Sequence, residues 1–216
     1  MAVYPCHKCI FVHIPKTGGS SVTTILKRDS LLSSKHEIIS PKEQGATLKE
    51  LIGLAGKDVD EYFSFCFVRN PWDRFVSAYH YVIQRRPELT AVSAHDNFTD
   101  FTRSIGEDPA KYLSIRYFRP QWSFLEAGDT GRQIDFVGRF ENFSVDLKYA
   151  LNKIGRPHLQ IRHRKKSQRS DYRHYFNNET RKIVANVYAR DIENFGYSFN
   201  DGTRRTSSFL KGWSWR

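Results

Sequence analysis

The sequence has 216 residues, 14% of which are aromatic, and its formal net charge is +11. This length suffices for one α/β domain with a substantial core and is short for two domains. Three cysteines argue against a disulfide framework, and no apolar run is long enough to span a bilayer. The positive charge favours a polyanionic partner, which could be a nucleotide, a nucleic acid, an acidic glycan or a membrane surface, although a solvated basic surface has the same composition.

The first motif is a C-x-x-C formed by Cys6 and Cys9, with His7 inside it. It invites a zinc or redox interpretation, but no second pair follows at metal-ligand spacing. We therefore expect a structural role for these cysteines and no metal. The chain begins at Met1 without a charged and then apolar signal segment, so we expect a cytoplasmic protein.

Residues 11–21, Phe-Val-His-Ile-Pro-Lys-Thr-Gly-Gly-Ser-Ser, join an apolar strand to a loop with one lysine and two glycines. Glycines let backbone N–H groups approach oxygen atoms closely, and a helix that starts at Ser20 or Ser21 points its positive end at an anion. Lys16 adds a full charge where a leaving oxygen would become negative. Because the lysine precedes the glycines, the loop does not have the Walker A pattern. The segment predicts a phosphate-binding loop unlike that of an ordinary ATPase.

A second candidate binding segment starts at residues 62–69, an aromatic and β-branched run typical of a buried strand. Asn70 and Pro71 follow as an N-cap and a first-turn proline, which predict the start of a helix. Arg69 thus lies at the carboxyl end of a strand, and Ser77 lies two turns into the next helix. A guanidinium and a hydroxyl placed in this way could bind a second phosphate.

The rest of the chain alternates predicted strands with predicted helices. This alternation predicts an α/β, P-loop-like three-layer fold, with a mainly parallel central sheet flanked by helices. Ligands in such sheets bind at the carboxyl ends of the strands. We expect a single domain over residues 1–216, with a core at about 9–199 and a C-terminal tail at 200–216. Further strands are expected at 36–40 and 134–138, and helices at 21–28, 47–54, 70–84, 144–154 and 179–194.

The two candidate segments resemble the nucleotide-binding boxes of sulfotransferases. Residues 13–21 look like the 5′-phosphosulfate loop of that family, and residues 67–79 look like its 3′-phosphate box. The match is closest to the branch with carbohydrate sulfotransferases of the heparan and chondroitin type and small bacterial relatives. The resemblance covers about residues 9–199 and includes Pro120-Gln121, residues 137–142 and residues 195–199.

The resemblance implies transfer of a sulfuryl group from 3′-phosphoadenosine 5′-phosphosulfate (PAPS) to an acceptor hydroxyl or amine. Lys16 would stabilise the bridging oxygen as the S–O bond breaks, and no metal is implied because fixed cations neutralise the charge. Backbone N–H groups and hydroxyls of the loop would hold the 5′-phosphate, and Arg69 with Ser77 the 3′-phosphate. The donor-binding residues implied in this way are Pro15, Lys16, Thr17, Gly18, Gly19, Ser20, Ser21, Arg69, Ser77, Ser167 and Arg169.

Ser167 and Arg169 come from a basic segment at residues 156–173. A solvated loop would have this composition, and so would an electropositive lid over the nucleotide or an entry track for an acidic acceptor. In the resembled family a loop in this part of the chain closes over the cofactor, which makes these two residues candidate contacts.

The general base is less clear from the sequence. Many relatives carry a histidine just before the helix predicted at 47–54, where this chain has residues 44–46, Gln-Gly-Ala. His36 and Glu37 on the expected second strand are therefore the candidates for the base, with Glu43 behind them. His13 is expected to orient the loop.

The acceptor is expected to be an acidic sugar or another small molecule, bound by a positively charged pocket. Nucleic acid is not expected as a partner. Two other functions stay open: a catalytically inactive nucleotide-fold module that binds acidic glycan or nucleic acid, and an atypical phosphate-transfer enzyme. The residues expected to line the acceptor pocket are Arg85, Arg86, Arg116, Tyr117 and Arg119.

Overall fold

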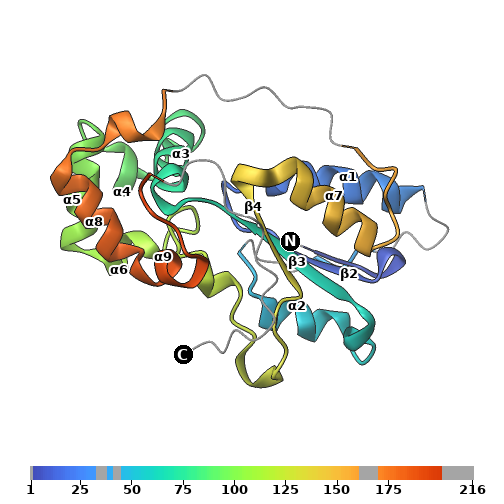
Figure 1. Ribbon diagram of the computed structural model, residues 1–216. Helices are drawn as coiled ribbons and strands as arrows, with labels where there is room; N and C mark the ends of the chain where they lie inside the picture. The colour runs from blue at the N-terminus through green and yellow to red at the C-terminus, as the bar shows by residue number, and fades with distance from the viewer. Residues whose placement is uncertain (1, 33–37, 41–44, 161–169, 201–216) are drawn as a thin grey trace. The chain divides into compact units, whose positions relative to one another are not determined.

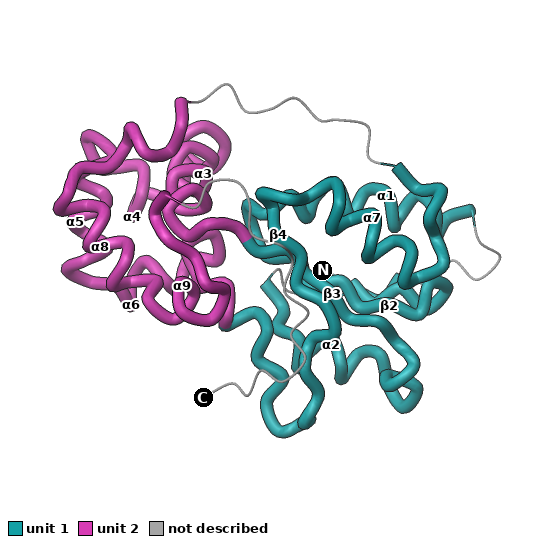
Figure 2. The backbone as a smooth tube through the Cα atoms, viewed as in Figure 1, with its two compact units in different colours: residues 1–68, 123–165, 203–216 teal, residues 69–122, 166–202 magenta. Residues whose placement is uncertain are grey.

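The computed structural model describes residues 2–32, 38–40, 45–160 and 170–200 of the protein. The chain divides into two compact units, and Figure 2 shows them in different colours. The first unit comprises residues 1–68, 123–165 and 203–216, and the second comprises residues 69–122 and 166–202. Short 3-10 helices occur at Pro5–His7, Val59–Glu61, Trp122–Phe124, Gly128–Thr130, Phe140–Asn142 and Tyr172–Tyr175.

The first unit contains a four-stranded sheet in the order β1-β2-β3-β4 (Figure 1). Strands β2 (Cys9–Val12), β3 (Phe63–Val68) and β4 (Phe136–Arg139) are parallel, and β1 (Ala2–Tyr4) is antiparallel to β2. The α/β fold with a mainly parallel sheet is therefore confirmed. Strand β1 was not predicted because three residues are too few to show a period of two.

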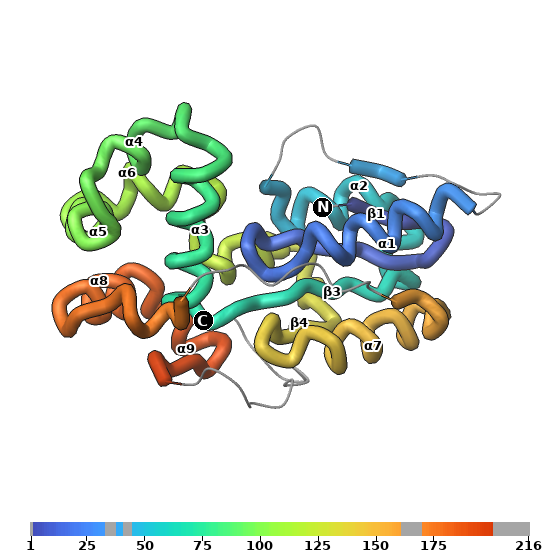
Figure 3. Tube along the Cα trace, turned by 90° about the horizontal axis from the view of Figure 1, so that it is seen from above, coloured from blue at the N-terminus to red at the C-terminus, as the bar shows by residue number. Residues whose placement is uncertain are grey.

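Alternate strand residues form an aromatic layer on one face of the sheet. Phe11, Phe65 and Phe136 are direct neighbours in the strand register, and the ring centroids of the first two lie 5.0 Å apart. Helices α1 (Gly19–Leu31) and α7 (Phe143–Lys153) pack on this layer and run side by side along it, as Figures 1 and 3 show. The helix predicted at 144–154 is thus confirmed within one residue at each end.

Helix α2 (Leu48–Ala55) covers the opposite face of the sheet and contacts β1 and β2 (Figure 1). The predicted capping box is present: Thr47 Oγ1 accepts the N–H of Glu50, and the Glu50 carboxylate accepts the N–H of Thr47. The sheet therefore lies between two helical layers, which is the three-layer arrangement that the sequence predicts.

The strand expected at residues 36–40 does not form within the part of it that the structure describes. Residues 36 and 37 lie outside the described ranges, and of residues 38–40 only Ile39 pairs, in an isolated antiparallel bridge with Val3. Their backbone N–H and C=O groups exchange hydrogen bonds of 2.9 and 3.0 Å. Because β1 occupies the place beside β2, this segment meets only the outer edge of the sheet.

His7 is buried in the turn between β1 and β2, within a small polar network. Its Nε2 lies 3.0 Å from Ser30 Oγ and 3.4 Å from Asp29 Oδ2, and Arg156 Nε donates to the same carboxylate oxygen at 2.8 Å. Burial, and then the charge of Arg156, lower the pKa of His7 below its ordinary value of 6.5. The network joins the end of α1 to the turn that follows α7.

We expect the protein to lose stability as the pH falls below about 6.5. His7 takes up a proton more readily in the unfolded chain, so its contribution is complete above pH 6.5 and declines towards its lower folded-state pKa. The slope for one such group is at most about 1.4 kcal/mol per pH unit. Urea unfolding at pH 7.5, 6.5 and 5.5 should show a smaller decline in His7→Gln than in wild type. Exposed His174 supplies the control His174→Gln, and equal declines in all three proteins would contradict the prediction.

The second unit is helical in its described residues and is built around an aromatic core. The Phe75 ring stacks on Phe101 with centroids 5.4 Å apart, and Phe118 packs edge-on against Phe75 at 5.6 Å. These rings come from distant parts of the chain, so tertiary packing stabilises the short helices. The helices are α3 (Pro71–Arg85), α4 (Thr90–Ser93), α5 (Phe98–Glu107), α6 (Pro109–Leu113), α8 (Asn178–Val187) and α9 (Ala189–Phe195).

The single helix expected at 179–194 is in fact two helices, α8 and α9, and this expectation was wrong. Tyr188 leaves helical geometry between them (φ −110°, ψ 26°), and its buried hydroxyl donates to the carbonyl of Phe118 at 2.7 Å. The periodic apolar stripe continues across the break, so no sequence pattern marks it. The predicted stop at Gly196 is confirmed, since its φ of +61° is the left-handed cap that glycine favours.

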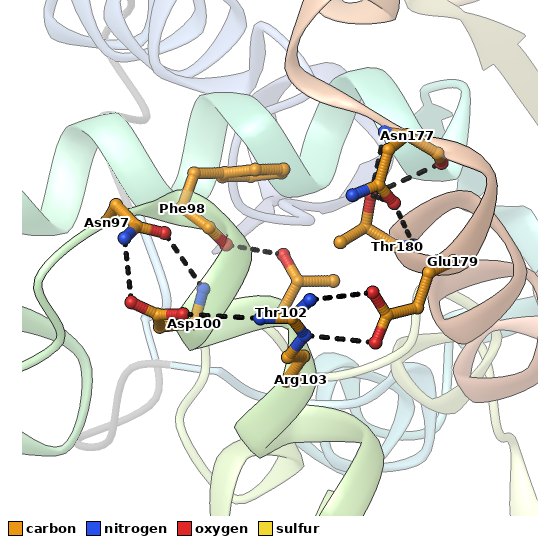
Figure 4. Close-up of polar contacts among 8 residues, drawn as sticks. All are labelled: Asn97, Phe98, Asp100, Thr102, Arg103, Asn177, Glu179 and Thr180. Carbon is orange, nitrogen blue, oxygen red and sulfur yellow. Dashed lines mark hydrogen bonds and ion pairs between the residues drawn. The ribbon is translucent and has the colours of Figure 1, made fainter.

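Polar contacts on the surface join α5 to α8 (Figure 4). Arg103 donates two hydrogen bonds of 2.9 Å to the carboxylate of Glu179, while Asn97 and Asn177 cap the starts of the two helices. An exposed ion pair of this kind contributes little to stability, because water screens it and ordering two long side chains costs entropy. The aromatic core, rather than this pair, therefore holds the helices together.

Candidate functional site

The loop between β2 and α1 has a strained backbone at its lysine. Lys16 has φ +70° and Gly18 has φ +86°, and Gly18 is the N-cap of α1, which starts one residue before the predicted Ser20. A left-handed conformation is ordinary for glycine and uncommon for lysine. Strained residues of this kind cluster at ligand-binding and catalytic sites. The strand, loop and helix expected of a phosphate-binding segment are all present.

The hydroxyls of the loop differ in where they lie. Thr17 is buried, and its Oγ1 donates to the carbonyl of Ile14 at 2.9 Å, so this hydroxyl proton is used inside the loop. Thr17 was expected to bind a phosphate through both its hydroxyl and its backbone N–H, and only the backbone N–H is left for that role. Ser20 is exposed and Ser21 is half-buried, both in the first turn of α1, where the N–H of Ser21 donates to the carbonyl of Gly18 at 3.0 Å.

Both glycines of the loop lie too close to aromatic rings to carry a side chain. A Cβ on Gly19 would lie 2.2 Å from Cδ2 of His13, and one on Gly18 would lie 2.8 Å from Cε2 of Phe143. The His13 ring stacks in turn on Phe11, with centroids 5.9 Å apart. His13 therefore braces the start of α1 against the sheet.

We expect Gly19→Ala to destabilise the protein by about 1–3 kcal/mol, because the added methyl group overlaps the His13 imidazole. Replacing His13 with alanine opens that space, so the double variant should lose less stability than the two single losses added together. Urea unfolding of the four proteins measures this coupling. Gly53→Ala on α2 is the control, because a Cβ there meets nothing within 4 Å. Strict additivity of the two changes would contradict the prediction.

In the second unit, Arg69 directly follows the last residue of β3 and is only 7% exposed. Its Nε donates to Asp73 Oδ2 at 2.7 Å. The predicted start of α3 is confirmed: Asn70 accepts the N–H of Trp72 at 3.1 Å, and Pro71 occupies the first helical position. The cap at Asn70 thus fixes the backbone on the side of Arg69 that leads into α3.

Asp73 and Ser77 are four residues apart on α3, so they lie on one side of it, and Arg69, which precedes the helix, pairs with Asp73. Asp73 was missed as a member of this group in the sequence, although its i, i+4 spacing from an arginine was a usable signal. Its carboxylate orients the guanidinium through Nε. With Nε paired to Asp73, the two Nη groups of the guanidinium form the edge that would take a phosphate bidentately. Ser77 is half-buried one turn further along.

Four predicted site residues lie outside the described ranges. They are His36 and Glu37, the candidates for the general base, and Ser167 and Arg169 of the basic segment. Two basic residues that flank this part of the chain are used in ion pairs. Arg156 binds Asp29, and Arg173 binds Asp171, lowering the pKa of that carboxyl to about 2.

Three of the residues expected to contact an acceptor come together in the second unit. Arg86 Nη1 donates to the hydroxyl of Tyr117 at 3.0 Å, and the Arg116 guanidinium lies 4.8 Å from the centre of the same ring. The ring of Tyr81, which the sequence did not single out, lies 5.0 Å from that of Tyr117. Arg86 also pairs with Glu88. Because Tyr117 is buried, this cluster offers two cations beside the half-buried ring of Tyr81.

The cysteines are thiols: Cys6 is half-buried, and Cys9 and Cys66 are fully buried. Burial raises the pKa of both buried thiols. Within the described ranges, no three His, Cys, Asp or Glu side chains gather as ligands for a metal ion. No helix in those same ranges is long and apolar enough to cross a bilayer.

Comparison with known proteins gives two kinds of match. The profile described as "Sulfotransferase family" matches residues 1–198. Carbohydrate sulfotransferase 14 of Danio rerio is 25% identical in an alignment that covers 91% of this chain and 62% of that protein. Carbohydrate sulfotransferase 10 of Xenopus laevis is 23% identical, covering 88% of this chain and 65% of its own length. The human carbohydrate sulfotransferase 10 is 22% identical, and the match covers 90% of this chain and 66% of the human protein.

This chain therefore spans a little under two thirds of the length of these relatives. No solved structure matches it significantly. The family profile, however, extends from the first strand through both candidate phosphate-binding segments and beyond α9. The chain belongs to the sulfotransferase family.

Proposed function

We propose that this protein transfers a sulfuryl group from PAPS to a hydroxyl or amine of an acceptor such as a carbohydrate. The observation that carries this proposal is the loop at residues 13–18, in which Lys16 adopts a left-handed backbone just before α1. The family match supports the reaction type, and the names of the relatives support a carbohydrate acceptor.

In the first unit, the proposed donor contacts lie at the amino end of α1. The backbone N–H groups of Gly19 and Ser20 would bind the 5′-phosphate, helped by the positive end of a 13-residue helix. Lys16 would neutralise the bridging oxygen as the bond to sulfur breaks. Because sulfuryl transfer resembles phosphoryl transfer through a loose transition state, positioning and charge stabilisation supply most of the catalysis.

In the second unit, Arg69 and Ser77 would bind the 3′-phosphate, the group that distinguishes PAPS from ATP. The ion pair with Asp73 supports this role because it orients the guanidinium before the nucleotide binds. His36 and Glu37 stay candidates for the base that accepts the proton of the acceptor. The fixed cations Lys16 and Arg69 supply the charge neutralisation in this proposal, which involves no metal ion.

The acceptor that fits best is an anionic carbohydrate. Arg86 and Arg116 would bind a carboxylate or sulfate, and the half-buried ring of Tyr81 would lie against a sugar ring. The net charge of +11 would attract such an acceptor over a longer range.

Calorimetry with three ligands tests the donor: 3′-phosphoadenosine 5′-phosphate (PAP), ADP with Mg²⁺, and a short oligonucleotide. We expect tight binding of PAP, unchanged when Mg²⁺ is removed, and weak binding of the other two. Binding of ADP with Mg²⁺ as tight as that of PAP would contradict the proposal and favour a phosphate-transfer enzyme. Tight binding of the oligonucleotide alone would favour a nucleic-acid-binding module.

A separate measurement tests activity, because residues 44–46 lack the histidine that many relatives carry there. Labelled sulfate from PAPS is followed onto a panel of neutral and acidic oligosaccharides. We expect transfer, with the acidic acceptors preferred. PAP binding without transfer to any acceptor would favour the alternative function, an inactive module that binds nucleotide or glycan.

A further inference from the structure

Gln121 lies against the backbone of Arg69 and is completely buried. Its Oε1 accepts the N–H of Arg69 at 2.9 Å, and its Nε2 donates to the carbonyl of Arg69, also at 2.9 Å. One side-chain amide therefore satisfies both backbone groups of the residue just beyond β3. A neighbouring strand would otherwise supply those two bonds.

Two buried charged residues hold the segment that carries Gln121. The carboxylate of Asp191 accepts the backbone N–H groups of Gln121 and of the next residue, both at 2.8 Å. The guanidinium of Arg74 donates to the carbonyls of Tyr117 and Arg119, at 3.2 and 2.9 Å. The whole connection from residue 117 to residue 122 is fixed by these contacts.

Burial of these two charges is unfavourable by itself. It raises the pKa of Asp191 and lowers the pKa of Arg74. Each group is retained in the interior by hydrogen bonds to the backbone and by the opposite charge of the other. What the two residues fix together is the place of the Gln121 amide, and so the backbone orientation of Arg69.

We infer that Gln121 is a positioning residue, which sets the direction of the Arg69 side chain and so the strength of 3′-phosphate binding. This inference rests on the proposed function, since it assumes that Arg69 binds that phosphate. Gln121 does not contact the nucleotide. A clamp on both the N–H and the C=O of Arg69 fixes the peptide planes on either side, so the Cα–Cβ direction cannot rotate. Without the clamp, the guanidinium would meet the phosphate less often in a bidentate geometry.

The test compares the affinities for PAP and for adenosine 5′-phosphate, which lacks the 3′-phosphate. The dissociation constant for adenosine 5′-phosphate divided by that for PAP measures the contribution of the 3′-phosphate alone, and a larger ratio means a larger contribution. Gln121→Met keeps the size of the side chain and removes both hydrogen bonds. We expect it to lower the ratio about tenfold to hundredfold, with the affinity for adenosine 5′-phosphate changed less than about threefold.

Two further variants separate positioning from general destabilisation. Thr102→Val breaks a buried hydrogen bond of 2.7 Å to the Phe98 carbonyl in the same unit, and it should leave the ratio unchanged. In an Arg69→Ala background, Gln121→Met should cause no further fall in the ratio. If Gln121→Met does not fold, Gln121→Asn provides a second test, because the amide is one methylene shorter and cannot reach both backbone groups of Arg69 in the same geometry.

The outcomes are distinguishable. A large ratio in wild type that Gln121→Met leaves unchanged overturns this inference and leaves the proposed function standing. The inference is likewise overturned if both nucleotides weaken equally, which indicates a merely structural role. A wild-type ratio near one overturns the proposed function, and this inference with it.

Discussion

Replacement of Lys16 by alanine should lower kcat for sulfuryl transfer by about 10²–10³-fold. The ammonium is proposed to neutralise the bridging oxygen, whose negative charge develops only as the S–O bond breaks. An interaction made mainly in the transition state lowers kcat far more than it weakens ground-state binding. We therefore expect the affinity for PAP to fall by much less than kcat. Single-turnover transfer from labelled PAPS and calorimetry with PAP measure the two effects.

Two control variants make this result specific. Lys27→Ala removes an exposed lysine from α1 and should retain full activity. Lys16→Gly should be as inactive as Lys16→Ala and more stable than wild type by about 0.5–1 kcal/mol, because the φ of +70° is natural for glycine. A Lys16→Ala protein that keeps its wild-type kcat would remove the lysine from the proposed chemistry.

Replacement of Arg69 by alanine should weaken PAP binding about tenfold to hundredfold. A charge-assisted bidentate contact to the 3′-phosphate is lost, while contacts to the 5′-phosphate stay. Binding of adenosine 5′-phosphate should therefore change little. Arg69→Lys should recover only part of the loss, since an ammonium cannot replace the planar fork. Calorimetry with the two nucleotides measures each of these affinities.

The carboxylate beside Arg69 adds a second effect. Without the guanidinium, Asp73 would repel a bound phosphate, so Arg69→Ala/Asp73→Asn should bind PAP more tightly than Arg69→Ala does. Arg103→Ala, which removes an exposed arginine of the same unit, is the matched control and should leave both affinities unchanged. Equal weakening of PAP and adenosine 5′-phosphate in Arg69→Ala would contradict the assignment of the 3′-phosphate to this residue.

Sequence patterns predicted the parts of the fold that depend on neighbours within a few residues. The capping box at Thr47 and Glu50, the Asn70 cap with Pro71, and the left-handed stop at Gly196 are all present. Each depends on hydrogen bonds or dihedral angles within one helical turn, so the local sequence is sufficient. The core strands at 63–68 and 136–139 were predicted as 62–69 and 134–138 for a related reason, since apolar runs mark strands buried on both faces.

Other features depend on partners far along the chain, and they were missed or predicted wrongly. The expected strand at 36–40 reduces to one bridge at Ile39 in its described part, because β1 already lies at that edge of the sheet. The last helix is broken at Tyr188, whose hydroxyl bonds a carbonyl 70 residues away. An apolar stripe predicts which side of a helix is buried; it does not predict where a buried hydroxyl finds its acceptor.

By itself, the sequence determined the fold class, the strand, loop and helix around Lys16, and the resemblance to sulfotransferases that the family match bears out. Only the tertiary structure decided how those residues are supported. It turns the Thr17 hydroxyl inward, packs His13 on Gly19, and places the Gln121 amide on the backbone of Arg69, 52 residues away. Contacts over such separations leave no periodic or local pattern, because they depend on which surfaces meet when the core packs.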